Sequence, residues 1–173
     1  LEEGHKVHAI VVNSGNANAA TGLQGEKDAA DTALVMAETM KINPKEVLVC
    51  STGVIGVPMP MDVIKKGVPE VAHTLSDTLD GGEAAAEAIM TTDTVKKTIA
   101  VEEQIGEVTF TVGGMGKGAG MIHPNMATLL GFVTTDVNIT KEMLQKALSK
   151  AINTSFNMIT VDGDTSTNDT VLV

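Results

Sequence analysis

The stretch VLVCSTG, residues 47–53, decides the fold class of this chain. Its four apolar residues are typical of a buried strand, and its last three are the small residues of a turn. A similar apolar run, residues 7–12, precedes it and ends in a loop of small residues at 13–18. Between the two runs, apolar residues recur at helical spacing over residues 28–40. We therefore expect a strand–helix–strand unit in which each strand ends where its small residues begin.

The rest of the chain continues this alternation of helices and strands. Residues 59–79 predict two helical pieces, because Gly67 and Pro69 interrupt the pattern. Together these segments predict a mixed α/β (α+β) fold with layers of sheet and helix, in a single domain over residues 1–173. The other predicted elements are a helix at 83–90, a hairpin over 96–112 that turns near 104–106, a glycine-rich loop at 113–125, strands at 129–135 and 156–161, and a helix from its N-cap Thr140 to about 153.

Composition narrows the classes of function. The 173 residues are 43% hydrophobic, which is enough for a sizeable core. Twelve basic and 22 acidic residues give a formal net charge of −10, which argues against nucleic-acid binding and against docking on an anionic membrane. The sequence has no apolar run of about 18 residues that could cross a membrane. We expect a cytoplasmic protein whose single cysteine, Cys50, is an inert thiol in the core.

Several motifs fail on inspection. Residues 114–119 match the dinucleotide pattern G-x-G-x-x-A, but no helix start follows them. Residues 162–168 resemble the start of a calcium loop, yet Thr167 stands where that loop needs glycine. The four histidines show no ligand-like spacing with one another. We therefore predict neither a metal site nor a cofactor.

Small residues and one lysine carry the remaining chemistry. Thr52 and Gly53 end a predicted buried strand, and Lys117 lies among five glycines in residues 113–120. Glycine lets backbone N–H groups approach a ligand closely, and lysine is a natural partner for a carboxylate or phosphate. Two interpretations stay open from these residues alone. One is a site for an anion, and the other is a tight connection with a solvent-exposed lysine.

Five stretches, in order along nearly the whole chain, make the sequence resemble a known family. It resembles the ornithine acetyltransferases, the bifunctional glutamate N-acetyltransferases of the cyclic arginine pathway. The resemblance implies a layered sheet-and-helix sandwich of the self-processing N-terminal-threonine acetyltransferase type, and it implies that this chain is a central piece of a longer protein. The stretches are VVNSGNANAATG from Val11, STGVIG from Ser51, AAEAIMTTDT from Ala85, GGMGKGAGMIHPNMATLLGFVTTD from Gly113 and SFNMITVDGDTSTNDT from Ser155.

The resemblance also implies a site. Members of this family cut themselves before a threonine, which maps onto the bond between Ala127 and Thr128. Residues 1–127 would then end an alpha chain, and residues 128–173 would begin a beta chain. Thr128 is implied as the nucleophile, Thr52 and Gly53 as the oxyanion hole, and Thr91, Lys117 and Thr128 as substrate-binding residues.

The implied reaction is acetyl transfer from N-acetylornithine to glutamate in arginine biosynthesis. One acetylated threonine would serve both half-reactions, so ping-pong kinetics are expected. Acetyl-CoA could serve as a second acetyl donor, and the implied assembly is a heterotetramer of two alpha and two beta chains. Two alternatives stay open: an N-terminal-threonine amidohydrolase or aminopeptidase, and a non-catalytic module that binds anionic ligands.

Overall fold

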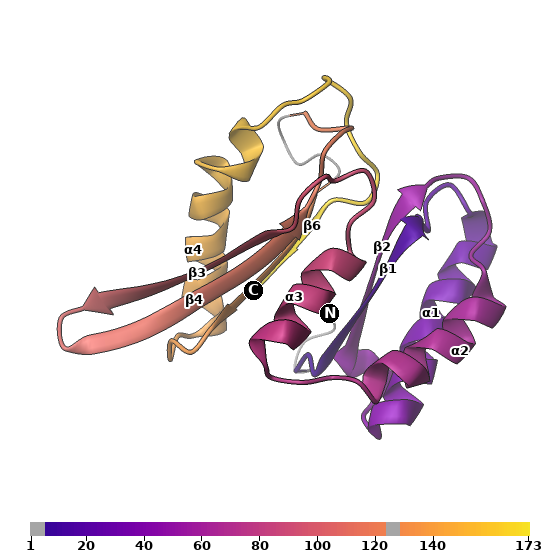
Figure 1. Cartoon of the computed structure of the whole chain (residues 1–173), viewed down its shortest axis with the longest axis horizontal. Helices are drawn as coiled ribbons and strands as arrows, with labels where there is room; N and C mark the ends of the chain where they lie inside the picture. The colour runs from indigo at the N-terminus through magenta and orange to yellow at the C-terminus, as the bar shows by residue number, and fades with distance from the viewer. Residues whose placement is uncertain (1–5, 124–128) are drawn as a thin grey trace. The chain divides into compact units, whose positions relative to one another are not determined.

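A computed structural model describes residues 6–123 and 129–173 (Figure 1). The chain divides into two units, Leu1–Ile89 and Met90–Val173. Both units combine helices with strands, which confirms the predicted mixed α/β class. The predicted junction between residues 127 and 128 lies outside the described residues, so this division and the single domain stay predictions.

The first unit is built on two parallel strands. β1 (Ala9–Asn16) pairs with β2 (Val47–Val54) along its whole length, from Ala9↔Val47 to Asn16↔Val54. Both strands therefore run through the small residues at which we predicted that they would end. The reason is tertiary, because each of these residues has a partner in the neighbouring strand, including Gly15 opposite Gly53.

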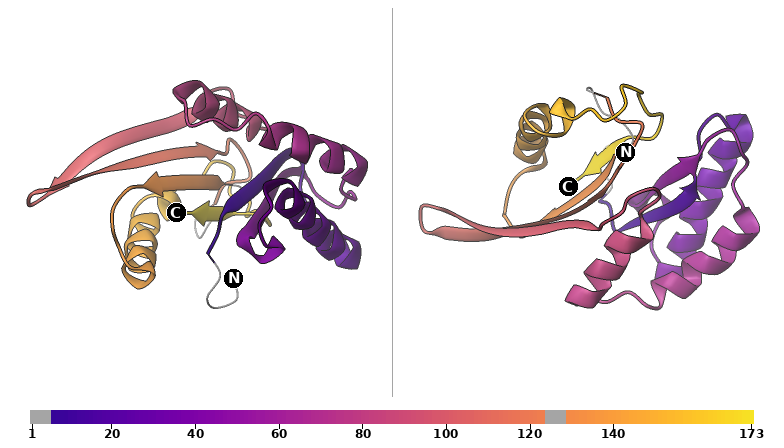
Figure 2. Two further views of the ribbon diagram at one scale, coloured as in Figure 1. Left: turned by 90° about the horizontal axis from the view of Figure 1, so that it is seen from below. Right: turned by 45° about the horizontal axis from the view of Figure 1, so that its top comes forward.

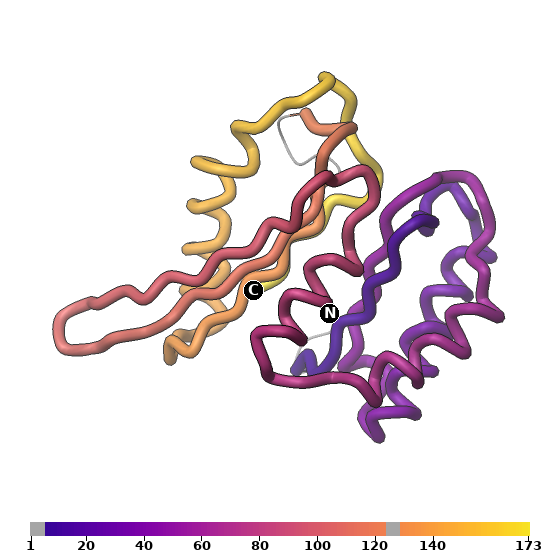
Figure 3. Tube along the Cα trace, in the orientation of Figure 1, coloured from indigo at the N-terminus to yellow at the C-terminus, as the bar shows by residue number. Residues whose placement is uncertain are grey.

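Two helices supply the core of this unit. In the Cα trace, α1 (Gly22–Met40) and α2 (Met61–Ala72) run beside the β1–β2 pair (Figure 3). Cys50 of β2 is 7% exposed, which confirms its predicted place in the core, and burial raises the pKa of its thiol. The buried core residues come from both strands and both helices and are Val11, Met36, Ala37, Val47 and Val68.

The helix boundaries of the first unit differ from the predicted ones. α1 begins at Gly22 rather than at residue 28, and the turn before it is fixed because Asn18 Nδ2 donates to the Gly25 carbonyl at 2.8 Å. α2 continues through Gly67 and Pro69, because the buried Val68 anchors that turn of the helix in the core. The remaining elements are the short 3-10 helix η1 (Pro44–Glu46) and α3 (Leu79–Ala88), which contains the two glycines that we placed before it.

The second unit contains a four-stranded sheet in the order β3-β4-β5-β6. The predicted hairpin is confirmed, since β3 (Lys97–Ile105) and β4 (Val108–Lys117) pair in antiparallel fashion. β5 (Leu130–Thr135) pairs with β4 from Val112 to Lys117, so the turn end of the hairpin extends beyond it (Figure 2). β6 (Thr170–Leu172) then pairs with β5 in parallel.

Two predictions in this unit are wrong. Residues 113–117 are strand rather than glycine-rich loop, because β3 and β5 pair with them on both sides. The predicted strand at 156–161 is instead the 3-10 helix η2 (Phe156–Met158) followed by a connecting segment. The place beside β5 is taken by β6, whose Thr170 lies opposite Leu130.

The helix α4 (Lys141–Asn153) begins at the predicted N-cap, where Thr140 Oγ1 accepts a hydrogen bond from the Met143 N–H at 3.3 Å. We expect Thr140→Ala to lower the free energy of unfolding by about 1 kcal/mol, because an early N–H loses its partner. Thr140→Ser keeps a hydroxyl and should stay close to the wild type. Urea unfolding of the full-length protein measures both variants. Equal free energies of unfolding for Thr140→Ala and the wild type would contradict a capping role of Thr140.

Candidate functional site

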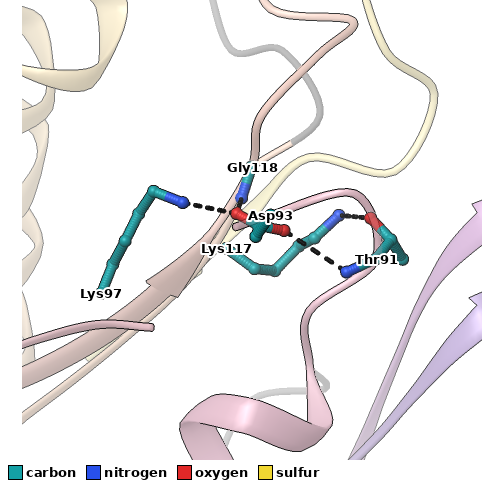
Figure 4. Close-up of polar contacts among 5 residues, drawn as sticks. All are labelled: Thr91, Asp93, Lys97, Lys117 and Gly118. Carbon is teal, nitrogen blue, oxygen red and sulfur yellow. Dashed lines mark hydrogen bonds and ion pairs between the residues drawn. The ribbon is translucent and has the colours of Figure 1, made fainter. Parts of the chain in front are cut away.

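A buried lysine and a threonine meet in the second unit. Lys117 is the last residue of β4 and is only 1% exposed. Its Nζ donates a hydrogen bond to Oγ1 of Thr91, which lies ahead of β3, at 2.9 Å (Figure 4). The antiparallel pairing of β3 with β4 places Lys97, at the start of β3, opposite Gly116, next to Lys117. The hydrogen bond between Lys117 and Thr91 thus joins residues that lie 26 positions apart.

A buried carboxylate fixes the surroundings of this pair. Asp93 Oδ1 accepts hydrogen bonds from the Gly118 N–H at 2.8 Å and from Lys97 Nζ, and Oδ2 accepts from the Thr91 N–H at 3.3 Å (Figure 4). Burial alone would raise the pKa of Asp93, but these hydrogen bonds outweigh it, so its pKa is lowered. Asp93 is therefore an anion at neutral pH. The Asp93 carboxylate thus links the backbone N–H of Gly118, the residue after Lys117, to the backbone N–H of Thr91.

The electrostatics of Lys117 favour an anionic partner. Burial lowers the pKa of its ammonium group, and the negative charges of Asp93 and Asp169 act in the opposite sense. A cation in these surroundings interacts with an anion more strongly than an exposed lysine does, because water screens the charges less. The Lys117 ammonium and the Thr91 hydroxyl are suited to hold a carboxylate of a small ligand.

The predicted oxyanion-hole residues lie in the first unit. Thr52 is 3% exposed in β2, and Gly53 follows it with φ of +133°, in the region that favours glycine. A Cβ at Gly53 would lie 2.3 Å from the carbonyl carbon of Gly15, so only glycine fits opposite that strand. A threonine hydroxyl and a glycine N–H can both donate to a developing oxyanion without adding charge.

The structure brings together some of the predicted site residues. Thr91 and Lys117 are in contact, and the neighbouring Thr92 is not the residue that accepts this hydrogen bond. Ala127 and Thr128 lie outside the described residues, so their roles stay predictions. Sequence reasoning missed Asp93, although an acidic residue directly after two threonines of a quoted motif was an available signal.

Two negative findings apply to the described parts of the chain. No group of three or more histidine, cysteine, aspartate or glutamate residues there could hold a metal ion. No helix in residues 6–123 and 129–173 is both long enough and apolar enough to cross a membrane.

The fold and this site define an α/β protein with a buried cationic centre. The family model of the ArgJ family matches residues 1–173, and the chain therefore belongs to the ArgJ family. It is 58% identical over 168 residues to the "Arginine biosynthesis bifunctional protein ArgJ" of Symbiobacterium thermophilum, a match that covers 97% of this chain and 41% of that protein. The protein of the same description from Caldanaerobacter subterraneus subsp. tengcongensis is 52% identical, with the same coverage. The chain thus spans about two fifths of the length of these curated relatives.

Solved structures agree with this assignment. The crystal structure of arginine biosynthesis bifunctional protein argJ from Bacillus halodurans matches 68% of this chain and 61% of its own, with a TM-score of 0.62 and 49% identity. The ornithine acetyltransferase of Mycobacterium tuberculosis, solved in complex with ornithine, matches 67% of this chain and 61% of its own, with a TM-score of 0.63 and 45% identity. At these identities the similarity concerns sequence as well as fold.

Proposed function

We propose that this chain is the central part of a self-cleaving acetyltransferase of arginine biosynthesis. The observation that carries the proposal is the buried Lys117 ammonium held at the Thr91 hydroxyl, in a chain that belongs to the ArgJ family. Both proposed substrates, N-acetylornithine and glutamate, carry an α-carboxylate that this cation can bind. The ornithine in the complex of the Mycobacterium tuberculosis relative supports this class of ligand.

The proposed catalyst forms by self-cleavage. The Thr128 hydroxyl attacks the carbonyl carbon of Ala127, the peptide C–N bond breaks, and the acyl group moves from nitrogen to oxygen. This shift frees the α-amine of Thr128, which takes up the hydroxyl proton. Water then hydrolyses the ester, which leaves a carboxylate on Ala127 and regenerates the Thr128 hydroxyl. An α-amine has a reference pKa of about 7.7–8.0, so it can accept the hydroxyl proton near neutral pH.

The mature reaction has two half-reactions on one nucleophile. Thr128 takes the acetyl group from N-acetylornithine and releases ornithine, and the amine of glutamate then takes the acetyl group from the threonine ester. Each half passes through a tetrahedral oxyanion, for which we propose Thr52 and Gly53 as the donors. Acetyl-CoA could replace N-acetylornithine as the donor. The cleaved chains are proposed to stay together as a heterotetramer in the cytoplasm.

Intact mass of the full-length protein under denaturing conditions tests the proposal. We expect two pieces that meet at Ala127/Thr128 in the wild type and a single uncut chain in Thr128→Ala, because alanine has no hydroxyl to attack. The uncut Thr128→Ala variant should also lack acetyl transfer from N-acetylornithine to glutamate. An uncut wild-type chain would contradict the mechanism. Release of free acetate without transfer to an amine would favour a hydrolase.

A further inference from the structure

One continuous segment, residues 160–170, holds the chain on both sides of residues 123–128. Ile122 lies before that stretch and is 8% exposed, and Leu129 lies directly after it. The contacts on the two sides are made by different residues of the segment, Asp162 upstream and Asp169 downstream. All of these residues belong to the second unit.

On the upstream side, the carboxylate of Asp162 accepts hydrogen bonds from two successive backbone N–H groups. Its Oδ2 accepts from Met121, and its Oδ1 accepts from Ile122 at 2.9 Å. The Ile122 carbonyl in turn accepts from the Val161 N–H at 2.8 Å and from the Thr160 hydroxyl at 3.1 Å. Both backbone groups of Ile122 are thus bound by the same segment.

The local backbone beside the Asp162 carboxylate has an uncommon conformation. Met121 has φ of +57°, a left-handed conformation that is uncommon for residues other than glycine, asparagine and aspartate. A Cβ at Gly120 would lie 3.4 Å from Asp162 Oδ2, so the main chain passes close to the carboxylate. The hydrogen bonds from the Met121 and Ile122 N–H groups lower the pKa of Asp162, which is therefore charged at neutral pH.

On the downstream side, the chain is held by Asp169 and by the strand that follows it. Asp169 Oδ1 accepts from the Leu129 N–H at 2.9 Å, and the Leu129 carbonyl accepts from the Thr170 N–H at 3.0 Å. The parallel pairing of Thr170 with Leu130, which is 1% exposed, continues this connection into the sheet. Leu129 is the residue that follows the proposed nucleophile Thr128.

We propose that Asp162 and Asp169 are positioning residues for self-cleavage, and that Asp162 afterwards retains the upstream chain end. This inference rests on the proposed cut between Ala127 and Thr128. An acyl shift needs the hydroxyl and the carbonyl in a narrow range of relative positions, and fixing both flanks on one segment reduces the freedom that must be lost. After the cut, Ile122 belongs to the upstream piece and Asp162 to the downstream piece, so their contact joins the two.

The test is the rate of conversion of the full-length precursor into two pieces, followed by mass spectrometry. In Asp162→Asn, the amide offers one acceptor oxygen for two N–H groups, so we expect cleavage to slow by about tenfold or more. Asp169→Leu removes the acceptor for the Leu129 N–H and should slow cleavage similarly, by about tenfold. Asp169→Asn keeps a carbonyl oxygen that can accept from the Leu129 N–H, and it should restore the rate to within about threefold of the wild type.

Two controls separate positioning from general stability. Asp164→Asn removes the same charge in the same turn, where Asp164 meets Asp162 through its own backbone N–H, and it should cleave at the wild-type rate. Thr140→Ala destabilises α4 without touching either flank and should also leave the rate unchanged.

Three results would overturn the inference. Wild-type cleavage rates in both Asp162→Asn and Asp169→Leu would overturn it while leaving the proposed function intact. If Thr140→Ala slowed cleavage as much as Asp162→Asn and Asp169→Leu do, the two carboxylates would have only a structural role. A wild-type precursor that stays whole would remove the proposed function and this inference together.

Discussion

Lys117→Met is expected to reduce kcat/KM for acetyl transfer by about a hundredfold or more, because the buried cation that we propose as the partner of the substrate carboxylate is lost. The KM for N-acetylornithine and the KM for glutamate should both rise, since the two proposed substrates share the α-carboxylate. Methionine fills a similar volume without a charge, so the folded state should persist at the 1% exposed position. Steady-state kinetics of the full-length enzyme, with a melting curve for each variant, measure these effects.

A matched substitution is available at the neighbouring lysine. Lys97 also forms an ion pair with Asp93, but its side chain is 45% exposed. Water can therefore solvate the Asp93 carboxylate in Lys97→Met and offset much of the lost ion pair. We expect an effect of less than about tenfold on kcat/KM from this variant. Equal losses in the two methionine variants, or unchanged KM values in Lys117→Met, would contradict a carboxylate site at Lys117.

The same site predicts a dependence on alkaline pH. The pKa of Lys117 is lowered from its ordinary value of 10.5, with burial as the largest cause. As the pH rises, Lys117 therefore loses its proton, and with it the affinity for a carboxylate, earlier than an exposed lysine would. The KM values of the wild type should rise on the alkaline side, whereas those of Lys117→Met should stay flat there.

Gly53→Ala is expected to destabilise the first unit by about 3 kcal/mol or more, because a positive φ and a direct clash act together. The new Cβ would lie 2.3 Å from the Gly15 carbonyl carbon and 2.6 Å from the Asn16 nitrogen, and both of these are backbone atoms of β1. The strands would have to separate at the end that carries Thr52. Urea unfolding of the full-length protein should show the loss, and acetyl transfer should fall with it.

Gly56→Ala is the control for this variant. Gly56 also has a positive φ, +75°, but a Cβ there would meet nothing within 4 Å. Only the backbone strain remains, so we expect a loss of about 1 kcal/mol. Similar losses at the two positions would show that the clash with β1 is relieved by a small shift of the strands.

Local sequence signals predicted the elements whose structure depends on near neighbours. The hairpin, the capped helix after Thr140 and the buried Cys50 all follow from alternation, capping chemistry and apolar runs. The predicted strand boundaries were wrong where the pairing partners of a strand lie far away along the chain. Gly113 and Gly116 suggested a loop, but a ladder on each side of β4 satisfies their backbone groups and makes them strand.

The candidate site divides in the same way. Thr91 and Lys117 were assigned through motifs of the family, and the structure places them in contact. Asp93, Asp162 and Asp169 were not assigned, because what distinguishes them is the backbone N–H groups that they accept from, 25 to 41 positions away in the cases of Gly118, Met121, Ile122 and Leu129. A sequence motif lists residues, but it does not say which carboxylate is directed at which amide.

The sequence by itself determined the α/β class, the family and the small residues at which backbone and ligand could meet. It did so because apolar periodicity and motif order are properties of the chain alone. Only the tertiary structure decided that Lys117 is buried against Thr91, that Gly53 faces Gly15, and that one segment holds both Ile122 and Leu129. These depend on strand register and on burial, which arise when segments distant in sequence pack together.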